Sequence, residues 1–159
     1  MQSFFLSSNV GFLEYEGYYQ VVHEGSTTAK PIDASKLPFD EWERVCEKVK
    51  KSAVPGVDIE HFDFTFLSFL TYFLIVRNRK REYLTNENKS KSMDSVWKIT
   101  DVFQHIVCEY FLDANKNKYC NLFKYRDIAF SQKMGVKVFL FFARRKKLKT
   151  LVKIAYKLL

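Results

Sequence analysis

Residues 61–76 read HFDFTFLSFLTYFLIV, a long and mostly apolar stretch of this 159-residue chain. Its first residues alternate between apolar and polar, as in a strand, but Thr65, Ser68 and Thr71 repeat every three residues. The run is also longer than a usual strand of about 5–6 residues. The pattern therefore predicts a buried helix that begins at Asp63, as its N-cap, and ends at about residue 84. A strand remains the alternative.

The uncharged part of this stretch, residues 64–76, is shorter than the roughly 20 residues that a membrane span needs. We therefore expect it to form the central helix of a core. Membrane insertion is the weaker alternative, favoured only by the basic residues that follow, as they would after a stop-transfer segment.

Two further helices are predicted on either side of this stretch. Residues 38–53 open with proline and carry apolar residues at helical spacing, with Trp42 and Val49 at the two ends of the buried stripe. Residues 94–112 have the clearest helical periodicity of the chain. Residues 85–94, between the stretch 61–84 and the helix 94–112, are polar and predict a mobile loop.

The remaining segments are predicted as a mixture of strands and helices. Residues 3–23 contain two apolar runs around Glu16-Gly17 and predict a β-hairpin. Residues 119–134 predict a weaker helix that ends at Gly135, and residues 136–143 are compatible with a strand before a terminal helix. The expected fold is α+β and helix-dominated, a single domain over residues 1–159 with an N-terminal β-hairpin at about 3–23 and a helical body at about 38–159.

Charge is distributed unevenly along the chain. Residues 1–76 hold 6 Lys+Arg against 11 Asp+Glu, a net charge of −5, whereas residues 77–159 hold 20 against 7, a net charge of +13. No acidic residue follows Asp127. Such an asymmetry favours a polyanionic partner, or an acidic surface that faces a basic one within a larger assembly.

Two clusters carry most of this positive charge, one after residue 76 and one after residue 143, and we expect residues 77–81 and 144–149 to share one basic surface. In the terminal helix, Arg145, Lys149, Lys153 and Lys157 lie four apart and predict one basic stripe opposite a Leu/Val face. Four phosphate contacts by this stripe predict a slope of log K against log salt of about −3.6 on duplex DNA. The predicted nucleic-acid-binding residues are Arg77, Arg79, Lys80, Arg81, Arg144, Arg145, Lys146, Lys149, Lys153 and Lys157.

Motifs for catalysis and metal binding are missing from the sequence. It contains no Walker loop, dinucleotide fingerprint, GxSxG elbow or HExxH, and Glu60-His61 with Asp63 match no reactive spacing. His105 and Cys108 lie three apart but lack the paired spacing of zinc sites, so we expect core residues and no metal. We expect no catalytic residue, no cofactor and no enzymatic activity.

Three cysteines at no disulfide-like spacing are typical of a reducing compartment, and the N-terminus does not resemble a signal peptide. The leading expectation is an intracellular or virion protein that binds a nucleic-acid backbone, RNA or DNA, without sequence specificity and within a larger assembly. One alternative is a structural or adaptor protein that binds other proteins. The other is a peripheral, matrix-like protein on anionic membrane.

Overall fold

A computed structural model of the protein describes residues 33–51, 56–76 and 86–157. The chain divides into two units, Met1–Lys30 and Pro31–Leu159, and the helices below belong to the second. The described helices are α2 (Phe39–Lys51), α3 (Ile59–Thr71), α4 (Asn86–Tyr110), α5 (Phe130–Arg144) and α6 (Leu148–Lys157). A π-helical turn, Tyr72–Val76, continues α3, and short 3-10 turns cover Ala34–Lys36, Ala114–Lys116 and Lys118–Cys120.

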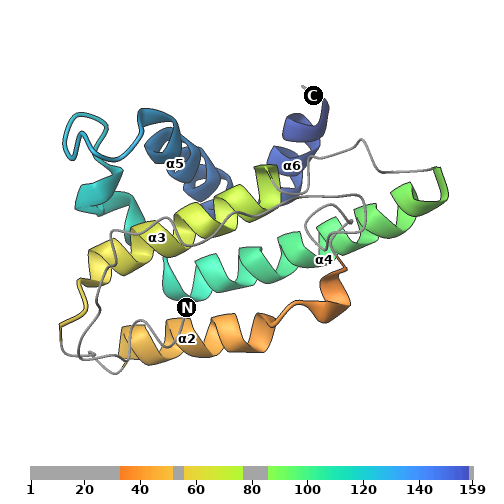
Figure 1. Ribbon diagram of the computed structural model, residues 1–159, viewed down its shortest axis with the longest axis horizontal. Coiled ribbons are helices and arrows are strands. Elements are labelled where there is room, and N and C mark those ends of the chain that lie inside the picture. Colours follow the sequence, from red (N-terminus) through yellow and green to blue (C-terminus); the bar gives the residue numbers. More distant parts are fainter. Residues whose placement is uncertain (1–32, 52–55, 77–85, 158–159) are drawn as a thin grey trace, which may run out of the picture. The chain divides into compact units, whose positions relative to one another are not determined.

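The 25-residue helix α4 organises this unit. It contacts α2, α5 and α6, while α3 packs chiefly on α5 (Figure 1). Between α4 and α5, the 3-10 turns Ala114–Lys116 and Lys118–Cys120 lie against α3 and α5, and the loop of residues 121–129 follows them.

Aromatic rings build the core between these helices. Trp42 of α2 meets Phe69, Phe73 and Phe103 at ring-centroid distances of 5.3, 5.7 and 5.8 Å. Phe66 stacks on Phe111 at 5.6 Å. Ring pairs at these separations add about 0.5–1.5 kcal/mol each beyond the burial of their area. Most of the described apolar side chains of the stretch 61–76 therefore lie in the core, as its composition predicts.

The predicted α+β class is wrong for the described part of the chain, which contains helices and no strand. Residues 136–143, compatible with a strand by sequence, lie inside α5. Their buried members, Val136, Phe139, Leu140 and Ala143, recur at helical and not at alternating spacing. The predicted β-hairpin at residues 3–23 lies outside the described residues.

Some predicted helix limits are confirmed and others are wrong. The helix predicted at 38–53 is confirmed as α2. The helix through the stretch 61–76 exists, but its N-cap is Asp58, whose side chain accepts hydrogen bonds from the backbone N–H groups of Glu60 and His61. Residues 86–93, predicted as a loop, form the start of α4. Gly135, predicted as a helix end, lies inside α5.

In the described part of the chain, none of the helices combines the length and the apolar character needed to cross a lipid bilayer.

Candidate nucleic-acid interface

The structure describes only part of the predicted binding set. Arg77, Arg79, Lys80 and Arg81 lie outside the described residues, as does the side chain of Lys157. The expectation that residues 77–81 and 144–149 share one basic surface therefore stays a prediction.

The predicted basic stripe on the terminal helix is wrong in its composition. Helix α6 begins at Leu148, so Arg145 lies before it, at the C-cap of α5. Lys149 forms an ion pair with Asp101 of α4, with 2.7 Å between Nζ and Oδ1. Lys153 is exposed, while Leu148 and Val152 are buried, as the predicted apolar face requires. The apolar face of α6 therefore packs on the core, and only part of its charge is free of an acidic partner.

A tight turn joins α5 to α6 and concentrates charge there. Lys146 has a positive φ of 54°, its N–H donates to the carbonyl of Ala143, and the N–H of Lys147 donates to the carbonyl of Phe142. These bonds close the end of α5 as a left-handed C-terminal cap does. We call Arg145, Lys146 and Lys147 the turn cluster; all three are exposed.

The exposed side of α5 is unusually apolar. Phe130 is 60% exposed and Phe141 is 51% exposed, and Met134 and Val138 are also exposed. Spacings of three to four residues place these four side chains on one side of the helix, opposite the buried Val136 and its neighbours. Lys137, also exposed, lies on the same side. We call these five residues the α5 face.

The α5 face and the turn cluster meet at Arg145. Its guanidinium carbon lies 3.7 Å from the centroid of the Phe141 ring, and its Nη1 donates to the Phe141 carbonyl at 3.2 Å. A guanidinium over an aromatic ring is a cation–π contact. The two surfaces therefore form one continuous strip of rings and cations, without a carboxylate among its own residues.

The loop at the other end of α5 is held by a buried lysine. Lys133 is 2% exposed, and its ammonium group donates to the backbone carbonyls of Lys124 and Tyr125, the latter at 2.8 Å. Tyr125 has a positive φ of 54°, which is uncommon for a bulky residue, and its ring meets that of Tyr119 at 4.7 Å. Phe123, in contrast, is 89% exposed. The ring of Tyr125 is thus partly covered by Tyr119, and Phe123 is the more exposed ring of the loop.

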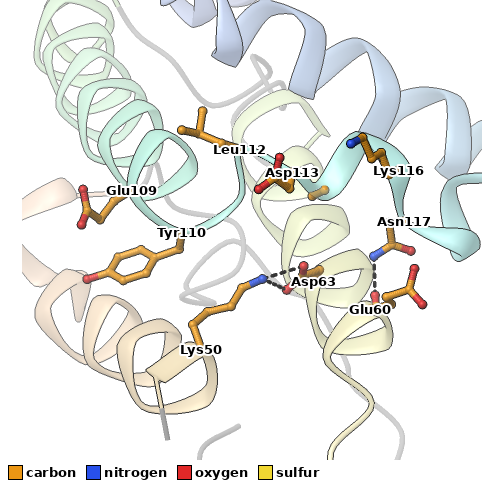
Figure 2. Close-up of a pocket in the computed structure, with 10 residues that line it drawn as sticks. Lys50, Glu60, Asp63, Glu109, Tyr110, Leu112, Asp113, Lys116 and Asn117 are labelled. Carbon is orange, nitrogen blue, oxygen red and sulfur yellow. Dashed lines mark hydrogen bonds and ion pairs between the residues drawn. The ribbon is translucent and has the colours of Figure 1, made fainter. Parts of the chain in front are cut away.

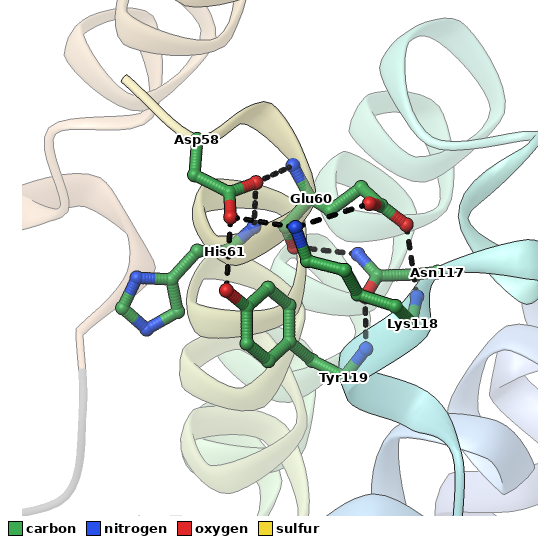
Figure 3. A network of polar contacts seen from close by, with 6 residues as sticks. All are labelled: Asp58, Glu60, His61, Asn117, Lys118 and Tyr119. Atoms are coloured by element: carbon green, nitrogen blue, oxygen red, sulfur yellow. Dashed lines mark hydrogen bonds and ion pairs between the residues drawn. The ribbon is translucent and has the colours of Figure 1, made fainter. Parts of the chain in front are cut away.

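A network of polar contacts ties the segment before this loop to the start of α3. Asp58 accepts hydrogen bonds from the Lys118 ammonium at 2.8 Å and from the Tyr119 hydroxyl at 2.9 Å (Figure 3). The hydrogen bond from Lys118, followed by that from Tyr119, lowers the pKa of Asp58 to about 2. Lys118 also lies 3.4 Å from the carboxylate of Glu60. The charge of Lys118 is therefore already matched by two carboxylates.

Acidic groups gather instead around a pocket between α2, α3 and the end of α4. A cavity of about 410 Å³ is lined by Glu109, Tyr110 and Asp113 from the end of α4 and beyond, with Lys50 and Asp63 opposite them (Figure 2). Lys50 forms an ion pair with Asp63, in which its Nζ donates a hydrogen bond to Oδ2 at 2.6 Å and lies 2.5 Å from Oδ1. Burial raises the pKa of Asp63, and Lys50 opposes that change. This pair joins α2 to α3, which gives it a structural role.

The described residues contain no group of three or more His, Cys, Asp or Glu side chains that could hold a metal ion. His105 and Cys108 face different partners. His105 Nε2 lies 3.2 Å from the carboxylate of Glu43, whereas Cys108 contacts Gln104 and the carbonyl of Ala143.

The α5 face and Phe123 were not part of the predicted site. The pattern of Phe130, Met134, Lys137 and Phe141 has helical spacing and could have shown the face, had residues 119–143 not been divided between a helix and a strand. No protein-family model, curated protein or solved structure matches the chain.

Proposed function

We propose that the α5 face and the turn cluster bind single-stranded nucleic acid without sequence preference, and that the protein is not an enzyme. The observation that carries the proposal is the mixture on one surface: exposed rings at Phe130 and Phe141, and exposed cations at Lys137, Arg145 and Lys146. Proteins that bind single strands combine cations along the backbone path with rings on which successive bases stack.

The exposed rings of the surface favour a single strand over a duplex. Bases in a duplex are stacked on one another, so exposed rings on a protein helix gain little from contact with them. In an unpaired strand, stacking on an aromatic side chain contributes about 1–3 kcal/mol per base. The 15 residues of α5 extend over about 22 Å at 1.5 Å per residue, enough for several nucleotides.

The charge around the surface supports the same partner. Lys146 and Lys147 form no ion pair among the described residues, whereas Lys149 and Lys118 do. Cations without a carboxylate partner release counterions when they meet phosphate, which favours binding at low salt.

A binding assay with three ligands tests the proposal. Fluorescence anisotropy would measure affinity for a labelled 12-nucleotide oligothymidylate and for a 12-base-pair duplex, and sedimentation would measure binding to vesicles of anionic and of neutral lipid. We expect the single strand to bind more tightly than the duplex. We also expect Phe141→Ser to weaken binding of the single strand more than binding of the duplex or the vesicles. Preference for anionic vesicles over both nucleic acids would favour the membrane alternative, and binding to none of them would favour a protein partner.

A further inference from the structure

A further pocket adjoins the α5 face at Lys137, near the middle of α5. It has a volume of about 320 Å³, near the lower end of the range of about 300–1,000 Å³ for small-molecule sites. Lys137 belongs both to this pocket and to the α5 face. We call it the lysine pocket; its lining includes Lys116, Asn117, Lys118, Asn121, Phe123 and Lys137.

Two of the polar residues of the lysine pocket are already engaged. Lys118 is paired with Asp58 and Glu60. The side chain of Asn117 accepts from the N–H of Tyr119 at 2.8 Å and donates to the carbonyl of Glu60 at 2.5 Å (Figure 3). These contacts hold the wall of the pocket in place and leave those two residues little capacity for a ligand.

The side chains of Lys116, Lys137 and Asn121 remain, and they offer hydrogen-bond donors. Neither Lys116 nor Lys137 has an ion pair within the described ranges, and both are exposed. The side-chain oxygen of Asn121 accepts from the N–H of Phe123 at 3.0 Å, which leaves its NH₂ group available. No carboxylate lines the pocket. Two ammonium groups and an amide donor around one hollow are suited to an anion such as phosphate.

An aromatic ring stands at the same pocket. Phe123 is 89% exposed, and its backbone is fixed by Asn121 on one side and by the bonds from Lys133 to the next two carbonyls on the other. A large ring exposed to this extent on an anchored loop has little to stabilise it there, and its face is open to a planar partner. A ligand that carries both a phosphate and a planar ring satisfies both halves of the pocket.

We propose that the lysine pocket binds one nucleotide of the bound strand, with its phosphate at Lys137 and Lys116 and its base stacked on Phe123. This inference rests on the proposed function, because the strand on the α5 face would reach the pocket through Lys137. It adds a defined end point to that path. Shared chemistry means that a free nucleoside monophosphate would occupy the same place more weakly.

The first test measures the full chain with the 12-nucleotide oligothymidylate and the matching duplex. Phe123→Ala should lower the affinity for the single strand by about 5-fold to 100-fold, because one stacked base is lost, and should leave the affinity for the duplex unchanged. Phe123→Tyr should restore the affinity. Leu112→Ala, which removes another exposed apolar side chain two residues beyond the end of α4, is the matched control and should change neither affinity. An equal loss of affinity for the single strand and for the duplex would overturn the assignment of Phe123 as a stacking residue.

The second test uses adenosine monophosphate and inorganic phosphate as probes in NMR titrations. The monophosphate should shift the amide signals of Asn121 and Phe123, phosphate alone should shift them less, and Lys137→Gln should abolish both effects. No shift, together with unchanged affinity in Phe123→Ala, would overturn the nucleotide pocket. The proposed function has a separate readout, which is the affinity of the wild-type chain for the oligothymidylate compared with the duplex and the vesicles.

Discussion

Replacing Lys133 with methionine removes the one buried ammonium group of α5 and keeps an unbranched side chain that is one atom shorter. Its two acceptors, the carbonyls of Lys124 and Tyr125, would lose their donor. A buried acceptor left without a partner costs about 1–3 kcal/mol, so the two together cost about 2–6 kcal/mol. Both residues are exposed, so water can reach the carbonyls once the loop shifts, and methionine has no charge to desolvate. We therefore expect a loss of about 2 kcal/mol in the free energy of unfolding.

Urea denaturation followed by tryptophan fluorescence measures this change, and hydrogen exchange locates it. The amides of residues 121–129 should exchange faster in Lys133→Met. The exchange of the α4 amides should rise only as much as the lower free energy of unfolding of the whole protein requires. Lys137→Met is the matched control, because Lys137 lies one turn away and is exposed; we expect a change within about 0.5 kcal/mol. If Lys133→Met keeps both the wild-type midpoint and the wild-type exchange of the loop, the anchoring role of Lys133 is wrong.

Three further changes test the packing described above. Lys50→Met alone should destabilise by about 2–3 kcal/mol, less than a fully buried pair would, and the double change with Asp63→Leu should recover most of that loss in urea denaturation. Because the folded pKa of Asp58 lies below its ordinary value, its network stabilises the fold above about pH 4 and is lost as pH falls toward 2. An NMR titration of the Asp58 carboxyl carbon should show a pKa below the ordinary value of an aspartate, and Lys118→Met should raise that pKa. Gly135→Ala should raise the free energy of unfolding by about 0.5–1 kcal/mol, because the added Cβ would lie at an ordinary 3.5 Å from Thr71; a loss would show tighter packing than described.

Sequence patterns predict the helices whose apolar residues keep a single period. Helix α2 follows its stripe from Trp42 to Val49, and the stretch 61–76 is buried as its composition requires. The N-cap of α3 was missed because Asp63 and Asp58 are equally good caps by type, and only tertiary packing shows that Asp63 turns inward to Lys50.

Helix α5 shows where local patterns fail. Its residues are apolar on two sides, one buried and one exposed, so the run 136–143 has no clear helical period and resembles a strand. Gly135 resembles a helix end but lies where α5 passes close to Thr71 of α3. The charge of the C-terminal half could be read from the sequence, but not the pairing of Lys149 with Asp101, which joins residues 48 apart.

The salt dependence of oligothymidylate binding tests the central claim most directly. If Lys137, Arg145, Lys146 and Lys147 each contact one phosphate, the slope of log K against log salt should be about −2.8 for a single strand. Lys146→Gln with Lys147→Gln should reduce it to about −1.4, whereas Lys48→Gln on α2 should leave it unchanged. A wild-type slope near zero, no binding at about 50 mM salt, or the same slope in the double variant would contradict binding through the α5 face and the turn cluster.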